Sequence, residues 1–313
     1  MAKVALVFPG QGTQHVGMGS SLLAEFAVVR DVFDRASSVL GINMRKLCLE
    51  GPQKVLDLTV NTQIAVLTLS IAIYSVFKEK TAIKPMVMAG HSLGEYTALY
   101  AADAIGFEDI FSVVQARAQY HQDAVPAGEG AMAAIIGLDD DIVESVCSEV
   151  RNSSAQVAVA IHNTSQQIVV SGHTAAVEKA MLIAKQKGAQ TVVKLPISAP
   201  CHCSLLQKAA DMLSEKLAQV EFHNPTTPVI PNCNPDVFYT KENARKLLLD
   251  QIVLPVKWRQ TVEKMAAMGV ETIVEIGPKR TLCGLIKRIN KNIQLMSVED
   301  TGSLYKTVEI LSA

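Results

Sequence analysis

The sequence has no large excess of charge of either sign. Its 313 residues include 29 Lys and Arg against 30 Asp and Glu, which gives a formal net charge of −1 at pH 7. Proteins that bind nucleic acids or anionic membrane surfaces through a general field carry a strong basic excess. We therefore expect neither nucleic acid nor membrane as a partner, and partners must be recognised at local sites.

The sequence also lacks an apolar run long enough to read as a membrane span. The longest run, 64–77, is interrupted by three hydroxyl side chains and falls short of the roughly 20 residues that a span needs. No export signal is visible, because Pro9 and Gly10 interrupt the apolar start and no small-residue cleavage site follows. The sequence predicts a buried helix over the apolar run and a cytoplasmic protein.

Six cysteines are present, but they are scattered rather than spaced as a disulfide framework. In a mid-sized chain without an export signal this favours reduced thiols in a cytosol. Cys201, His202 and Cys203 look at first like metal ligands. Adjacent residues on an extended chain point to opposite faces and cannot converge on one ion, so we predict no metal site.

Apolar residues make up 49% of the chain, enough for a large core in one large domain or two smaller ones. Short apolar runs at 3–8 and 85–89 predict buried strands, and each is followed by glycine-rich turn residues. Segments 62–78 and 92–104 have the length and apolar content of helices. Strands alternating with helices indicate an α/β fold with a mainly parallel sheet covered on both faces.

The middle of the chain is organised differently. A linker-like stretch at 125–130 is followed by six short predicted elements. The predicted elements are strands at 131–136, 156–162, 166–171 and 190–195 and helices at 140–150 and 174–187. Their βαββαβ order is that of the ferredoxin-like motif. We predict a small domain over 127–197, inserted into a large α/β domain made of 1–126 and 198–313. The second part of the large domain contains further strand candidates at 272–276 and 294–298.

Gly90-His91-Ser92-Leu93-Gly94 is a G-x-S-x-G nucleophile motif placed between a predicted strand and a predicted helix. The glycines allow a sharp turn that raises the serine hydroxyl above the sheet, and the helix start supplies an amide and a positive dipole end. The alternative is a chance match in a chain with 18 glycines. Because both flanks fit, the context favours Ser92 as a nucleophile.

A serine hydroxyl needs a nearby base, and seven histidines are available. His91 neighbours Ser92 in sequence, and we expect its side chain to point elsewhere. His202 follows a loop-like stretch, 197–201, where the chain returns to the large domain. Position alone leaves open whether His202 is a base or a structural histidine.

Arg117 lies among apolar residues of a predicted helix at 107–122. Such an arginine usually extends to the surface, and the sequence alone favours that interpretation. If the side chain instead faces a pocket, its planar fork suits a carboxylate held by two hydrogen bonds. The substrate would then be an acid.

Together these motifs resemble the malonyl-CoA:acyl carrier protein transacylase family, over nearly the whole chain. The matching segments are, in order, Phe8-Pro9-Gly10-Gln11-Gly12-Thr13-Gln14, Gly90-His91-Ser92-Leu93-Gly94-Glu95-Tyr96, Gln115-Ala116-Arg117, Gly130-Ala131-Met132-Ala133-Ala134, Asn163 with Gln167 and Ser171-Gly172, Pro200-Cys201-His202, and Glu275-Ile276-Gly277-Pro278. One such match is weak, whereas seven in the right order are strong.

The resemblance implies an α/β-hydrolase-like large domain with a ferredoxin-like insert, and an enzyme without a bound cofactor. Its reaction is transfer of malonyl from malonyl-CoA to the phosphopantetheine thiol of an acyl carrier protein, by a ping-pong mechanism through an acyl-serine ester. We expect this enzyme to act as a monomer. The pathway, fatty-acid or polyketide, stays open.

The resemblance also implies roles for individual residues. These are Ser92 as nucleophile, His202 as general base, the backbone amides of Gln11 and Leu93 as oxyanion hole, Arg117 as partner of the malonyl carboxylate, the main-chain carbonyl of Gln251 as the group that orients His202, and His91, Cys201, His121 and Asn163 as pocket residues. Cys201 and His121 depart from the family pattern, which has serine or a bulky aromatic residue at the first and commonly methionine at the second. A small residue at 201 leaves methylmalonyl open as a substrate.

Two rival functions use the same residues. A thioesterase or acyl hydrolase would keep Ser92 but pass the acyl group to water, and a non-catalytic protein would only dock carrier proteins. A buried Arg117 argues against the hydrolase, because a site for plain acyl chains gains nothing from a buried cation.

Overall fold

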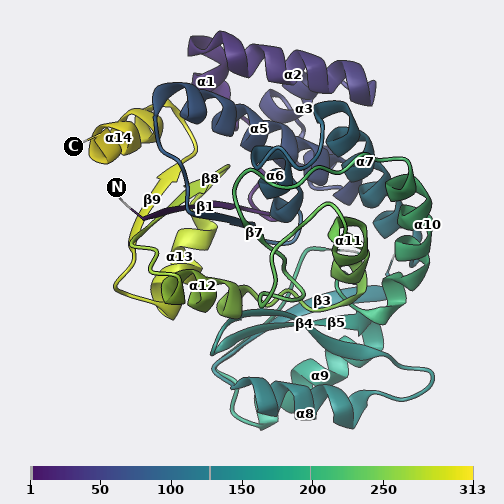
Figure 1. Ribbon diagram of the computed structural model, residues 1–313. Coiled ribbons are helices and arrows are strands. Elements are labelled where there is room, and N and C mark those ends of the chain that lie inside the picture. Colours follow the sequence, from purple (N-terminus) through teal and green to yellow (C-terminus); the bar gives the residue numbers. More distant parts are fainter. Residues whose placement is uncertain (1–2, 127, 198, 313) are drawn as a thin grey trace.

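The computed structural model describes residues 3–126, 128–197 and 199–312, and the larger of its two sheets is entirely parallel (Figure 1). Its strand order is β7-β2-β1-β8-β9. The strands are β1 (Val4–Phe8), β2 (Val87–Gly90), β7 (Val229–Ile230), β8 (Thr272–Ile276) and β9 (Gln294–Val298). Every residue of β1 and β8 is buried, which explains why both strands are apolar on both faces. The predicted parallel α/β sheet is confirmed.

Helices cover both faces of this sheet (Figure 1). Their bounds are α1 (Ser20–Glu25), α2 (Ala27–Leu40), α3 (Met44–Leu49), α4 (Gln53–Leu56), α5 (Thr59–Lys80), α6 (Gly94–Ala101), α7 (Phe107–Asp123), α10 (Gln207–Ala218), α11 (Ala244–Val253), α12 (Trp258–Ala267), α13 (Thr281–Ile289) and α14 (Thr301–Ser312), with a 3-10 turn, η1, at Ser204–Leu206.

Helix α5 contains the longest apolar run of the sequence. It is 22 residues long, so the expectation that this segment is too short to span a membrane is wrong: by length and composition α5 would pass. In the most apolar window of α5, 83% of the residues are buried inside the protein. Burial and not length identifies α5 as a core helix, and the predicted buried helix is confirmed.

The second sheet is antiparallel, with the order β4-β5-β3-β6. It consists of β3 (Gly130–Ile136), β4 (Val157–Thr164), β5 (Gln167–His173) and β6 (Thr191–Lys194), with α8 (Asp140–Val150) and α9 (Thr174–Gln186) on one face (Figure 1). The six elements follow the predicted βαββαβ order. The predicted domains cover 1–126 with 198–313, and 127–197. Of these limits, residues 1, 127, 198 and 313 lie outside the described residues, so the division at these positions stays a prediction.

Strand β3 shows how the small sheet joins the rest of the molecule. Ala131, Ala133 and Ile135 belong to a core shared with α8 and α9, whereas Met132 and Ala134, on the opposite face, belong to the large core. This alternation follows from the two-residue period of a strand. The small sheet therefore lies between its own two helices and the large domain.

Pairing within the large sheet decides where loops meet. Phe8 of β1 is paired with Gly90 of β2, and Ala89 of β2 is paired with Ile230 of β7. Because these strands are parallel, the segments that follow them emerge at one edge. In open α/β sheets ligands bind outside this carboxyl edge, so the loops after β1, β2 and β7 are the natural place for a site.

Candidate active site

The G-x-S-x-G segment forms a tight bend between β2 and α6, as predicted. Ser92 has φ of 52°, in the left-handed region, which costs a non-glycine residue on the order of 1–3 kcal/mol. A Cβ on Gly90 would lie 1.8 Å from the carbonyl carbon of Gly94, and one on Gly94 would lie 2.0 Å from the Phe8 oxygen. Both glycines are therefore required by close backbone approach.

His202 meets Ser92 directly. The Ser92 Oγ and His202 Nε2 atoms are 2.8 Å apart, and His202 Nδ1 is 2.8 Å from the main-chain oxygen of Gln251. A carbonyl only accepts hydrogen bonds, so the ring proton sits on Nδ1 and the Nε2 lone pair faces the hydroxyl. The structure thus brings together the pair predicted as nucleophile and base, with the Gln251 carbonyl in the expected orienting position.

The His202 ring is suited to accept a proton because it is neutral. It is 2% exposed, and burial, reinforced by the charge of Arg117, lowers the pKa of His202 to about 3. An imidazole that is uncharged at neutral pH keeps the free lone pair that a general base needs.

Arg117 points inward, so the surface position favoured from the sequence alone is wrong. Its side chain is 2% exposed and its Nη2 atom lies 3.5 Å from Ser92 Oγ. The guanidinium donates to the side-chain oxygens of Gln63 at 2.5 Å and Gln251 at 3.2 Å, and its central carbon lies 5.2 Å from the Tyr96 ring centroid.

None of the ion pairs among the described residues involves Arg117. Its charge is solvated by neutral amide oxygens, so an incoming carboxylate would be the first anion to contact it. An unpaired buried guanidinium is costly, which gives this position a strong preference for an acidic ligand.

The backbone amides of Gln11 and Leu93, which were predicted to form an oxyanion hole, belong to the loop after β1 and to the bend before α6. The loop after β1 carries Gln11 to the edge of the sheet beside the Ser92 bend, where the His91 amide donates to the Phe8 oxygen at 2.9 Å. The Ser92 amide is already taken, since it donates to the Asn232 side chain at 2.7 Å. Within the described part of the chain no hydrogen bond uses the amide of Gln11 or Leu93. Both remain available for a developing oxyanion.

The remaining predicted pocket residues form two pairs. His91 turns away from Ser92 as expected: its Nε2 is 3.0 Å from the Asn163 side-chain oxygen on β4, and its ring packs edge-on against Trp258. Cys201 Sγ lies 3.6 Å from Nδ1 of His121, a ring that is 1% exposed. Burial lowers the pKa of His121 well below its ordinary value, and the Arg117 charge acts in the same direction.

Cys201, His202 and Cys203 lie on a turn and not on the extended chain that the sequence argument assumed, and their side chains point to different partners. His202 faces Ser92 and Cys201 faces His121, whereas Cys203 donates to the Pro200 oxygen at 3.1 Å.

Sequence reasoning missed three polar residues that organise this site. Gln63 accepts a hydrogen bond from Arg117, and Asn232 accepts one from the Ser92 amide. Glu95 is fully buried and in contact with Asn232. The signal for Gln63 and Glu95 was a polar residue within an otherwise apolar helix. Asn232 follows β7, a strand of two residues that leaves no readable pattern.

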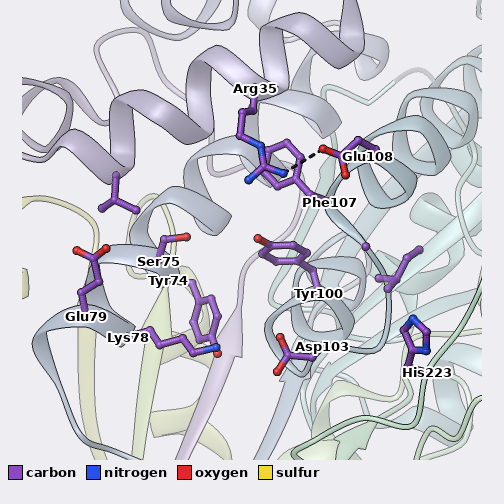
Figure 2. A pocket seen from close by; sticks show the side chains of 13 residues that line it. Arg35, Tyr74, Ser75, Lys78, Glu79, Tyr100, Asp103, Phe107, Glu108 and His223 are labelled. Carbon is purple, nitrogen blue, oxygen red and sulfur yellow. Dashed lines mark hydrogen bonds and ion pairs between the residues drawn. The ribbon is translucent and has the colours of Figure 1, made fainter.

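A separate hollow of about 650 Å³ lies on the helical side of the large domain, bordered by α2, α5 and α7 (Figure 2). The guanidinium carbon of Arg35 there lies 4.0 Å from the centroid of the Phe107 ring, Arg35 pairs with Glu108 at 3.0 Å, and Tyr100 also lines the hollow. Its lining residues include none of the predicted site residues. The hollow is lined by two basic and three acidic side chains, of which Arg35 and Glu108 are already paired, so it indicates no particular ligand.

Comparisons with known proteins agree with this geometry. The sequence model of the acyl transferase domain matches residues 5–307. The chain is 40% identical over 311 residues to the malonyl CoA-acyl carrier protein transacylase of Escherichia coli strain K12, covering 99% of this chain and 100% of the relative. The solved structure of the malonyl CoA-acyl carrier protein transacylase from Coxiella burnetii superposes with a TM-score of 0.97 at 40% identity, covering 100% of this chain and 98% of that one.

A further solved structure contains a bound partner. It is a malonyl-transacylase in complex with its type II polyketide synthase acyl-carrier protein, with a TM-score of 0.96 and 41% identity, covering 99% of this chain and 100% of that one.

Proposed function

The chain belongs to the acyl transferase family, and from that premise we propose that it moves malonyl from malonyl-CoA to the phosphopantetheine thiol of an acyl carrier protein. The observation that carries this proposal is the meeting of three groups: the Ser92 hydroxyl, the His202 imidazole at 2.8 Å and the Arg117 guanidinium at 3.5 Å. A nucleophile, a base and a carboxylate receptor are thereby assembled around one atom.

The first half-reaction transfers malonyl to the enzyme. Arg117 pairs with the malonyl carboxylate and so places the thioester carbon beside Ser92. His202 takes the hydroxyl proton as Oγ attacks, and the amides of Gln11 and Leu93 stabilise the tetrahedral oxyanion, each by about 3 kcal/mol. The carbon–sulfur bond breaks, and His202 returns the proton to the departing coenzyme A thiolate.

The second half-reaction repeats these steps in reverse. The carrier-protein thiol enters the vacated space, loses its proton to His202 and attacks the malonyl-Ser92 ester. Collapse of the second tetrahedral intermediate releases malonyl-carrier protein and restores the Ser92 hydroxyl. One thioester is exchanged for another, so the reaction needs no bound cofactor, and the kinetics are ping-pong.

The buried Arg117 disfavours the hydrolase alternative, and it selects dicarboxylic acyl groups over acetyl. Malonyl-carrier protein is the extender unit of both fatty-acid and polyketide synthesis, so the reaction serves either pathway.

The protein is soluble, and burial of α5 supports function away from the membrane. We further propose that it acts as a monomer, since every residue assigned a role comes from one chain. The free, buried cysteines support a reducing cytoplasm.

The test uses the purified protein and malonyl-CoA. Intact-mass measurement should show one malonyl adduct that maps to Ser92, and addition of phosphopantetheinylated carrier protein should discharge it with formation of malonyl-carrier protein. Rapid release of free malonate without any carrier protein would identify a hydrolase instead. A persistently unmodified mass would reject transfer chemistry altogether and leave a docking protein.

A further inference from the structure

Glu95 is a buried carboxylate without a role in the steps above. It lies in the first turn of α6, is fully buried, and receives three hydrogen bonds: from the Tyr239 hydroxyl, from the Gln251 side-chain nitrogen at 2.6 Å and from the Asn232 amide at 3.3 Å. All three partners donate. This arrangement suits an ionised carboxylate, which only accepts hydrogen bonds.

Gln251 connects Glu95 with the reacting groups. Its Nε2 atom donates both to Glu95 and to the Ser92 main-chain oxygen, the latter at 3.0 Å. Its Oε1 atom accepts from Arg117 at 3.2 Å, and its main-chain oxygen accepts from His202. One residue therefore contacts the nucleophile's backbone, the base and the carboxylate receptor.

The orientation of the Gln251 amide follows from these partners. Glu95 and the Ser92 carbonyl can only accept, so the amide NH2 must face them. The amide oxygen is then left facing Arg117, which can only donate. A reversed amide would place NH2 against the guanidinium and an oxygen against two other oxygens.

We propose that Glu95 is a positioning residue: it fixes the Gln251 side-chain amide so that its oxygen holds Arg117 in place for the substrate carboxylate. This inference rests on the proposed function of Arg117. It explains why a carboxylate is buried so close to the site without contacting Arg117 itself. The intervening amide holds the guanidinium with a neutral acceptor, whereas a direct ion pair would occupy the place of the substrate carboxylate.

The electrostatic environment of Glu95 agrees with this role. Burial raises the pKa of Glu95 to about 7, whereas the hydrogen bonds from Tyr239 and Gln251 and the charge of Arg117 act to lower it. The same contacts that fix Gln251 thus favour the ionised form of the carboxyl group and oppose the effect of burial.

The test compares Glu95→Met with Tyr239→Phe in the full-length protein. The rates of Ser92 acylation by malonyl-CoA and by acetyl-CoA are measured for each, with the melting temperature as a folding check. Glu95→Met removes the acceptor of the Gln251 NH2 and leaves that amide free to turn, so the ratio of malonyl to acetyl acylation should fall by about tenfold. Tyr239→Phe removes a hydrogen bond from the same carboxylate but leaves its contact with Gln251, so the ratio should stay at the parent value.

An unchanged ratio in Glu95→Met, or an equal fall in both variants, would overturn the inference. If Glu95→Met does not fold, Glu95→Asp takes its place. It withdraws the carboxylate by one methylene, the ratio should again fall, and a parent-like ratio would reject the role. Absence of malonylation in the parent protein would reject the proposed function instead, so the two failures are distinguishable.

Discussion

Ser92 and His202, 110 positions apart in the sequence, both have left-handed backbone conformations, with φ of 52° and 60°, and their side chains meet at 2.8 Å. Each residue is presented by a tight bend rather than by a regular helix or strand. Such strain persists only where the surroundings fix it. Around Ser92 this is done by the two close glycines and by Asn232, and around His202 by the Gln251 carbonyl. The pair is therefore preorganised.

Replacing His202 should remove the base while sparing the fold. Asparagine tolerates the left-handed conformation better than alanine, so His202→Asn is the suitable variant. Formation of malonyl-Ser92 near neutral pH should slow by roughly 10³-fold. Rapid-quench sampling with intact-mass measurement monitors the rate. His223→Asn, at an exposed histidine, is the matched control and should keep the parent rate. Undiminished acylation in His202→Asn would assign the base elsewhere.

Arg117→Ala should change which acyl group is transferred. It removes the charge-assisted hydrogen bonds proposed for the malonyl carboxylate, so kcat/KM for malonyl-CoA should fall by about 100-fold, while acetyl-CoA should be used as well as before or better. Steady-state assays with both donors measure the change. Arg35→Ala alters an arginine in the separate hollow and should leave both values intact. Equal malonyl activity in Arg117→Ala and parent would place Arg117 outside substrate recognition.

The same variant should move the acid limb of the pH–rate profile. Burial and then the Arg117 charge lower the pKa of His202, so removing that charge raises this pKa while burial still holds it below its ordinary value. Protonated His202 cannot accept a proton. With acetyl-CoA, acylation by Arg117→Ala should therefore decline at a higher pH than acylation by the parent, with the midpoint of the decline between about pH 3 and pH 6.5.

Circular dichroism at each pH separates this effect from acid unfolding. A limb that stays in place or moves to lower pH would show that the Arg117 charge does not reach His202.

Regular elements with strong local patterns could be predicted from the sequence. The bounds of α8, β8 and β9 are those expected, because each combines a clear apolar pattern with turn residues at its ends. The Ser92 bend was predictable for a similar reason, since its two glycines and the strand and helix on either side of it form one local motif.

Features decided by distant partners could not be predicted from the sequence alone. Helix α7 packs against α2, α5 and α10, so its Arg117 face is buried, whereas its sequence looks like that of a helix with one surface side. Asn232 depends on β7, which exists only because β2 pairs with it. The resemblance to a known family, and not the local pattern, placed Arg117 and Gln251 in the site.

Gly94→Ala should destabilise the protein, because its Cβ would lie 2.0 Å from the Phe8 oxygen, a backbone atom that cannot move without distorting β1. Overpacking of this kind costs about 1–3 kcal/mol or more in the free energy of unfolding. Gly284→Ala is the matched control, since Gly284 lies inside α13 with nothing within 4 Å of the added Cβ. In Gly284→Ala the better helix propensity of alanine should raise the free energy of unfolding by about 0.5–1 kcal/mol. Urea denaturation of both variants measures the difference. Equal stability of the two would contradict the close approach of the bend to β1 on which the position of Ser92 depends.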